Sequence, residues 1–157
     1  MAKIYIETSI VSYLTARPSN NLITAAWQKE TIDWWETQRK RFTLYISQVV
    51  IEEAERGDKT AASRRIEALA GLEILPLNDE VIGLSKTLIQ DGGVPKKALD
   101  DALHIAISAV HCVDFLLTWN CRHIDNAEMK PRIREICLEH GFQCPEIATP
   151  IELMGLN

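Results

Sequence analysis

Acidic and amide side chains stand at positions of this sequence where the surrounding pattern is apolar. They follow apolar runs or interrupt an apolar helical pattern, and they are Glu7, Glu52, Glu53, Asp100, Asp101 and Asn120. Taken singly, each of them is explained by a turn or by a solvated helix face. If the fold brings three of the carboxylates together, however, their like charges repel strongly. A divalent cation such as Mg²⁺ or Mn²⁺ removes this repulsion, binds phosphate oxygens and can hydrolyse a phosphodiester without a nucleophilic side chain.

The segment over residues 96–112 contains an acid that needs a partner. Its pattern is that of a helix with apolar residues on nearly every side, which indicates a buried helix. The helix dipole favours an acid in the first turn and explains one of the two aspartates. Asp101, however, shares a face with His104 and Ser108, and polar side chains on a buried helix must be satisfied by neighbours. We interpret His104 as structural, and Lys97, one turn before Asp101, as a candidate for substrate binding.

Strands and helices alternate along the chain and must position these residues. We expect strands over residues 4–6, 43–47, 73–77, 114–119 and 146–153. We expect helices over residues 9–14, 21–41, 47–57, 59–70, 79–90, 96–112 and 128–140, with Ser9 and Ser47 as N-caps. Such alternation with apolar strands predicts a parallel sheet covered by helices on both faces. Its site should lie outside the carboxyl ends of the strands, and the acids meet there if the first and fourth strands are neighbours.

Length, charge and composition limit the class of protein. The 157 residues favour a single domain over residues 1–157, and a net charge of −5 with a pI near 5.4 argues against a protein that coats nucleic acid. No apolar run reaches the roughly 18 residues of a membrane span, and the N-terminus lacks a signal-peptide pattern. We therefore expect a cytoplasmic protein with no membrane partner. The four cysteines form no C-x-x-C pair, which argues against a zinc knuckle and favours free core thiols.

Four segments, in this order, resemble the PIN-domain family, particularly the VapC-like toxins of type II toxin–antitoxin systems. They are YIETSIVSYL at the first strand, SQVVIEEAERGD, DDALHIAISA and LLTWNCRHI, and the tail IATPIEL is similar to the family's last strand. The resemblance spans almost the whole chain. It selects Glu53 rather than Glu52, because Gly57 lies four residues beyond Glu53, and it selects Asp101 from the aspartate pair.

The resemblance implies a three-layer α/β/α sandwich around a central, mostly parallel sheet. It also implies a Mg²⁺- or Mn²⁺-dependent endoribonuclease that cleaves single-stranded RNA, a homodimer, and a cognate antitoxin partner. In this interpretation the metal ligands are Glu7, Glu53 and Asp101, which form the catalytic set together with Asn120. Further residues hold the carboxylates or the substrate, and these are Thr8, Ser9, Thr118 and Lys97.

Two departures from the family pattern affect this interpretation. Glu7 stands where the family usually has Asp, and Asn120 stands where it often has Asp. Three full charges suit one metal ion better than two, unless Asp125 restores a fourth carboxylate. An alternative is a catalytically weakened PIN-like domain that binds RNA or protein. A phospho-acceptor signalling domain also uses acids at strand ends, but it needs an acidic pair after the first strand, which this chain lacks.

Several basic residues could hold RNA, although a solvated helix face also explains each of them. They are Arg39, Lys40 and Arg41; Arg64 and Arg65; Lys96 and Lys97; and Lys130, Arg132 and Arg134.

Overall fold

The strands form one parallel sheet in which the first and fourth strands are neighbours. The computed structural model describes residues 1–156. Its strands are β1 (Ala2–Ile6), β2 (Phe42–Ser47), β3 (Glu73–Leu75), β4 (Phe115–Leu117) and β5 (Glu146–Ala148), in the order β3-β2-β1-β4-β5. Every pairing in this sheet is parallel. The chain runs from β1 to one edge of the sheet and then returns to β4, so the topological switch point lies between β1 and β4.

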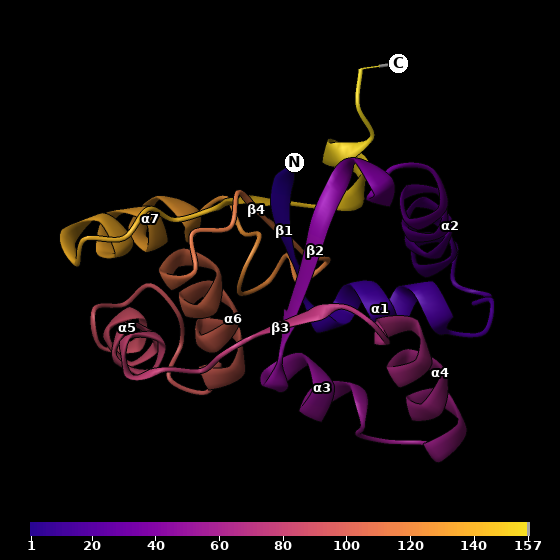
Figure 1. Ribbon diagram of the computed structural model, residues 1–157, viewed down its shortest axis with the longest axis horizontal. Coiled ribbons are helices and arrows are strands. Elements are labelled where there is room, and N and C mark those ends of the chain that lie inside the picture. The colour runs from indigo at the N-terminus through magenta and orange to yellow at the C-terminus, as the bar shows by residue number, and fades with distance from the viewer. Residues whose placement is uncertain (157) are drawn as a thin grey trace.

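Helices cover both faces of the sheet and confirm the expected three-layer α/β/α sandwich (Figure 1). One layer contains α1 (Thr8–Thr15), α2 (Leu22–Thr37) and α4 (Lys59–Leu69). The other contains α5 (Asp79–Gln90), α6 (Leu99–Val110) and α7 (Lys130–Glu139), while α3 (Gln48–Ala54) follows β2 directly. Short 3-10 turns span Arg39–Arg41 and Pro150–Leu153. Within residues 1–156, no helix combines the length and hydrophobicity that a membrane span requires.

The core lies between the sheet and the two helical layers. Ile4, Tyr5 and Ile6 of β1 have no exposed surface, because helices cover this central strand on both faces. The inner face of α6 is likewise buried from Ala102 to Ala109, apart from a half-buried Leu103. The four cysteines are free, as expected, but only Cys137 is a buried core thiol.

Some predicted element boundaries are wrong for identifiable reasons. Helix α1 begins at Thr8, so its N-cap is Glu7 and not Ser9. Ser47 does occupy the N-cap position of α3, but its side chain makes no capping hydrogen bond. The last strand ends at Ala148 instead of residue 153, because Pro150 has no N–H for a sheet and opens a 3-10 turn.

Two glycines offer a matched test of the packing around α5. A Cβ at Gly83, within α5, would meet no atom within 4 Å, whereas a Cβ at Gly93 would lie 2.9 Å from Ile136 Cδ1 and 3.2 Å from the Leu88 carbonyl oxygen. Gly83→Ala should raise the free energy of unfolding by about 0.5–1 kcal/mol, because alanine is the better helix former. Gly93→Ala should lower it by about 1–3 kcal/mol through overpacking. Urea denaturation measures both changes, and equal stability of the two variants would contradict this packing.

Candidate active site

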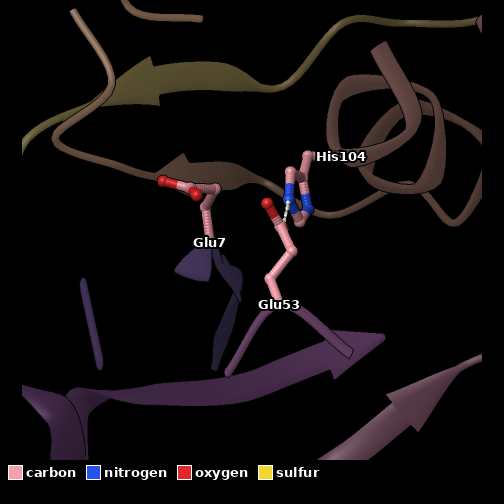
Figure 2. Close-up of side chains that lie close together, drawn as sticks. All are labelled: Glu7, Glu53 and His104. Atoms are coloured by element: carbon pink, nitrogen blue, oxygen red, sulfur yellow. Dashed lines mark hydrogen bonds and ion pairs between the residues drawn. The ribbon is translucent and has the colours of Figure 1, made fainter. Parts of the chain in front are cut away.

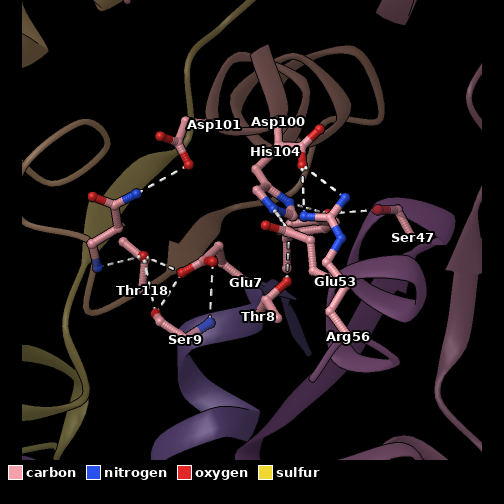
Figure 3. Close-up of polar contacts among 12 residues, drawn as sticks. Glu7, Thr8, Ser9, Ser47, Glu53, Arg56, Asp100, Asp101, His104 and Thr118 are labelled. Carbon is pink, nitrogen blue, oxygen red and sulfur yellow. Dashed lines mark hydrogen bonds and ion pairs between the residues drawn. The ribbon is translucent and has the colours of Figure 1, made fainter. Parts of the chain in front are cut away.

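Glu7 lies at the switch point of the sheet, where its carboxylate is held by neighbours (Figure 3). Its backbone N–H donates to the Leu117 carbonyl at 3.1 Å, which extends the β1–β4 ladder into the site. The Thr118 hydroxyl donates to Glu7 Oε1 at 2.6 Å, and the Ser9 hydroxyl donates to the same oxygen. Glu7 Oε2 accepts the Ser9 backbone N–H at 3.1 Å and thereby caps α1. Only 5% of Glu7 is exposed, so these donors replace water around the charge.

Glu53 reaches the same place from α3, which follows the neighbouring strand β2. Its Oε1 accepts a hydrogen bond from His104 Nε2 at 2.5 Å (Figure 2). The same oxygen accepts a hydrogen bond from the Thr8 hydroxyl at 2.8 Å (Figure 3). Burial raises the pKa of Glu53, but the hydrogen bonds from His104 and Thr8, together with the charges of His104 and Arg56, outweigh burial and lower it. Glu53 therefore remains ionised near Glu7, although both acids lie in a poorly solvated site.

Asp101 approaches from the first turn of α6. Its Oδ1 accepts the Asn120 amide N–H at 3.0 Å, and its Oδ2 lies 3.0 Å from His123 Nδ1. Asn120 Oδ1 in turn accepts the backbone N–H of His123 at 3.0 Å. Asp101 lies in the first turn of α6, so the positive end of the helix dipole stabilises its negative charge. Asn120 thus orients Asp101 through a hydrogen bond that an ionised aspartate could not donate.

The three acids are linked, but they are not equally close. Ligand atoms of Glu7, Glu53 and His104 all lie within 4.8 Å of one another, and Asp101 is outside this compact group. A hydrogen-bond path connects Asp101 to Glu7, because the Asn120 backbone N–H donates to the Thr118 hydroxyl at 2.9 Å and that hydroxyl donates to Glu7. The switch point therefore gathers all three predicted carboxylates around one edge of the sheet.

Two candidate residues lie apart from this network. Lys97 is exposed before α6 and makes no side-chain hydrogen bond or ion pair within the described part of the chain. Asp125 pairs with Lys130 Nζ at 2.5 Å, so its charge is compensated there. The core of the site thus contains three carboxylates rather than four.

His104 contributes to the site more directly than the sequence pattern suggests. Its side chain is completely buried, with Nε2 on Glu53 and Nδ1 2.7 Å from the Tyr5 hydroxyl. Burial lowers the pKa of His104, but the hydrogen bond to Glu53 and the negative charges of Glu7, Glu53 and Asp101 outweigh it and raise the pKa. The i, i+3 spacing from Asp101 signalled that both residues share a helix face, although nothing signalled their partners.

His123 and Arg56 also border the site without a sequence signal. His123 contacts Asp101, and the guanidinium of Arg56 lies 3.5 Å from Asp100 Oδ2. The Arg56 side chain is 65% exposed, so it remains accessible to an anion at the edge of the site.

The donor set fits a divalent cation that prefers oxygen. Glu7, Glu53 and Asp101 supply carboxylates, and within residues 1–156 no donor contacts Glu53 Oε2. Mg²⁺ and Mn²⁺ bind through one or two carboxylates and keep several waters, which this arrangement allows. The same waters and the polar groups around them could then contact a phosphodiester.

Comparison with known proteins identifies the family. The sequence matches the family model of the PIN domain over residues 4–128, so the chain belongs to the PIN domain family, whose members are generally nucleases. No curated protein matches the sequence.

A solved structure with a similar fold is the crystal structure of VapBC2 from Rickettsia felis bound to a DNA fragment from their promoter. The TM-score is 0.60 at 15% sequence identity, and the match covers 94% of this chain and 98% of that one. The resemblance to the PIN-domain family found in the sequence is thus confirmed, and the chain has the fold expected from that resemblance.

The hydroxyl of Thr118 offers a test of how Glu7 is held. Thr118→Val keeps the shape of the side chain but removes a donor from a buried carboxylate oxygen, so the free energy of unfolding should fall by about 1–3 kcal/mol. Urea denaturation measures this loss. Thr60→Val, at an exposed position of α4, is the control and should change stability by no more than about 0.5 kcal/mol. A Thr118→Val variant as stable as its control would show that Glu7 does not depend on this hydroxyl.

Proposed function

We propose that this PIN-domain protein is a Mg²⁺- or Mn²⁺-dependent endoribonuclease that cleaves single-stranded RNA, acting as one domain in the cytoplasm. The observation that carries the proposal is the position of three carboxylates at the switch point of the sheet: Glu7 and Glu53 lie close together, and Asp101 is linked to Glu7 by hydrogen bonds. Three carboxylates gathered in a poorly solvated place favour a bound cation, and cleavage of a phosphodiester is the chemistry that such a cation supports. The choice of RNA rests on the VapC-like resemblance.

The residues of the site have separate tasks in this mechanism. A bound cation would polarise the scissile phosphate and make a water nucleophilic at neutral pH. Glu7, Glu53 and Asp101 would hold that cation. Glu53 Oε2, which no donor contacts within the described residues, would be available to bind the cation or to accept a proton from the attacking water. Arg56, exposed beside Asp100, is placed to contact a phosphate oxygen of the substrate.

A basic concavity between α1 and α4 supports the proposal that the substrate is a nucleic acid. Its volume is about 480 Å³, and its lining includes Arg17, Arg64 and Arg65 with Asp58 as the only acid. The net charge of the whole chain is −5, so this local excess of positive charge is unusual. Arg65 also donates to the Arg56 carbonyl at 2.6 Å, which connects the concavity to the edge of the site. An RNA strand could therefore leave the carboxylates along these arginines.

The partner of the proposed toxin is a cognate antitoxin. Support comes from the similar fold in VapBC2, a structure that is also bound to promoter DNA. A homodimer follows from the same VapC-like resemblance.

The main test replaces one charge of the site. Asp101→Asn should reduce Mn²⁺-dependent cleavage of unstructured RNA at least about a hundredfold, because a cation ligand is lost. This reduction is larger than the one usually caused by loss of an outer-sphere partner. The amide oxygen of the variant can still accept the Asn120 N–H, and its NH₂ can donate to His123 Nδ1 when that ring carries its proton on Nε2, so the variant should fold. Glu52→Gln removes an exposed carboxylate beside Glu53 and should leave cleavage unchanged.

Different outcomes separate the proposal from its alternatives. Undiminished cleavage by Asp101→Asn would refute the site. A different result is a wild-type protein that binds RNA while cutting neither RNA nor DNA with Mn²⁺ or Mg²⁺. That result would favour the alternative of a catalytically weakened binding module, in which Glu7 and Asn120 in place of aspartate have weakened the site.

The basic concavity is tested by Arg17, which is exposed and makes no side-chain hydrogen bond within the described residues. In the Asp101→Asn background, Arg17→Ala should weaken binding of a labelled single-stranded RNA and lower the slope of log K against log salt by about 0.7, the value for one lost phosphate contact. Fluorescence anisotropy at several salt concentrations measures both. Lys86→Ala, at an exposed position of α5 in the opposite helical layer, is the control. Equal slopes for the two variants would argue against RNA in this concavity.

A further inference from the structure

A buried chain of polar side chains runs from the core to Glu53. The Tyr5 hydroxyl lies 2.7 Å from Ser47 Oγ and 2.7 Å from His104 Nδ1, and His104 Nε2 contacts Glu53 Oε1. These residues come from β1, β2, α6 and α3, and Ser47, Tyr5 and His104 have no exposed surface. Within residues 1–156, no buried side-chain nitrogen or oxygen lacks a partner, so the chain satisfies itself.

This chain ends inside the protein and cannot lead a proton to solvent. Ser47, at its far end, is completely buried. Both nitrogens of His104 are engaged, so the ring cannot turn without breaking two hydrogen bonds. The tilted packing of the Tyr5 and His104 rings, with centroids 5.7 Å apart, restricts it further. The arrangement therefore fixes the position of His104 Nε2 rather than transporting a proton.

The fixed position of His104 Nε2 determines which carboxylate oxygen of Glu53 remains available. A glutamate side chain has three rotatable bonds and needs contacts to hold one geometry. His104 from α6 and Thr8 from α1 both bind Oε1, while Oε2 has no donor within the described part of the chain. One oxygen of the carboxylate is thus committed to the protein, and the other is available.

We propose that His104, held by Tyr5 and Ser47, is a positioning residue that fixes Glu53 so that Oε2 is the oxygen directed to the cation-binding centre. The inference rests on the proposed metal-dependent function. Outer partners that orient metal ligands in this way typically change metal affinity 10- to 100-fold when they are removed. A histidine with a purely structural role would change stability alone.

Three substitutions separate the two roles. His104→Leu introduces an apolar side chain of similar size that has no N–H to donate to Glu53. His104→Gln carries an amide N–H close to the position of Nε2, so it can restore the bond to Glu53. Tyr5→Phe removes only the hydroxyl that holds the ring. Ser108→Ala is the control, because Ser108 is buried on the same helix and bonds only the His104 carbonyl.

The first measurement is the Mn²⁺ dissociation constant of the RNA-free protein by isothermal titration calorimetry. His104→Leu should raise this constant about 10- to 100-fold. His104→Gln should recover most of the affinity, Tyr5→Phe should lie between His104→Leu and wild type, and Ser108→Ala should match wild type. In RNA cleavage, His104→Leu should lower kcat and leave KM unchanged, because Glu53 acts on the cation and not on RNA binding.

Several results would overturn the inference. One such result is a His104→Leu variant that folds and binds Mn²⁺ with wild-type affinity. Another is a His104→Gln variant that binds Mn²⁺ as weakly as His104→Leu when the two variants have equal thermal stability. If circular dichroism shows that His104→Leu does not fold, Tyr5→Phe decides, and wild-type Mn²⁺ affinity in that variant refutes the positioning role. Wild-type protein that neither binds Mn²⁺ nor cleaves RNA would instead refute the proposed function, and the inference with it.

Discussion

The hydrogen bonding of the carboxylates of Glu7, Glu53 and Asp101 is the interaction on which the rest of the site depends. The carboxyl ends of β1 and β2 and the start of α6 bring these charges to one edge of the sheet, where Glu7 is buried and the side chains of Glu53 and Asp101 are partly exposed. Each carboxylate is stabilised by donors from other segments: Ser9 and Thr118 for Glu7, Thr8 and His104 for Glu53, and Asn120 and His123 for Asp101. These bonds hold each of the three acids in a defined position.

The two unusual residues of the site have complementary effects within this network. The longer side chain of Glu7 caps α1 through Oε2 and still reaches the hydroxyl of Thr118 through Oε1. Asn120 brings no charge, but its amide donates to Asp101 and its oxygen accepts a backbone N–H, so it orders the turn after β4. The site therefore has one negative charge fewer and one internal donor more than a site with four acids.

Much of the fold and part of the site could be predicted from the sequence. Apolar strands alternating with helices predicted a parallel sheet. Positions after strands or in an apolar helix drew attention to a set of acids, and the resemblance to the PIN-domain family then selected Glu53 and Asp101 to accompany Glu7. The boundaries were less predictable: Ser9 looked like an N-cap, but α1 begins one residue earlier and uses Glu7. Local spacing does not reveal whether a helix starts at the last strand residue or one turn later, because packing against the sheet decides that point.

The sequence by itself determined which residues carry charge and which strands and helices bring them to a sheet edge, since these properties depend on residue type and local periodicity. Only the tertiary structure decided the partners of those charges. His104 meets Glu53 across 51 positions of the sequence and Tyr5 across 99, and Thr118 meets Glu7 across 111. The pattern of one helix shows which residues share a face, but the neighbour of that face is set by strand order and by how α6 packs on β1, which no local spacing records.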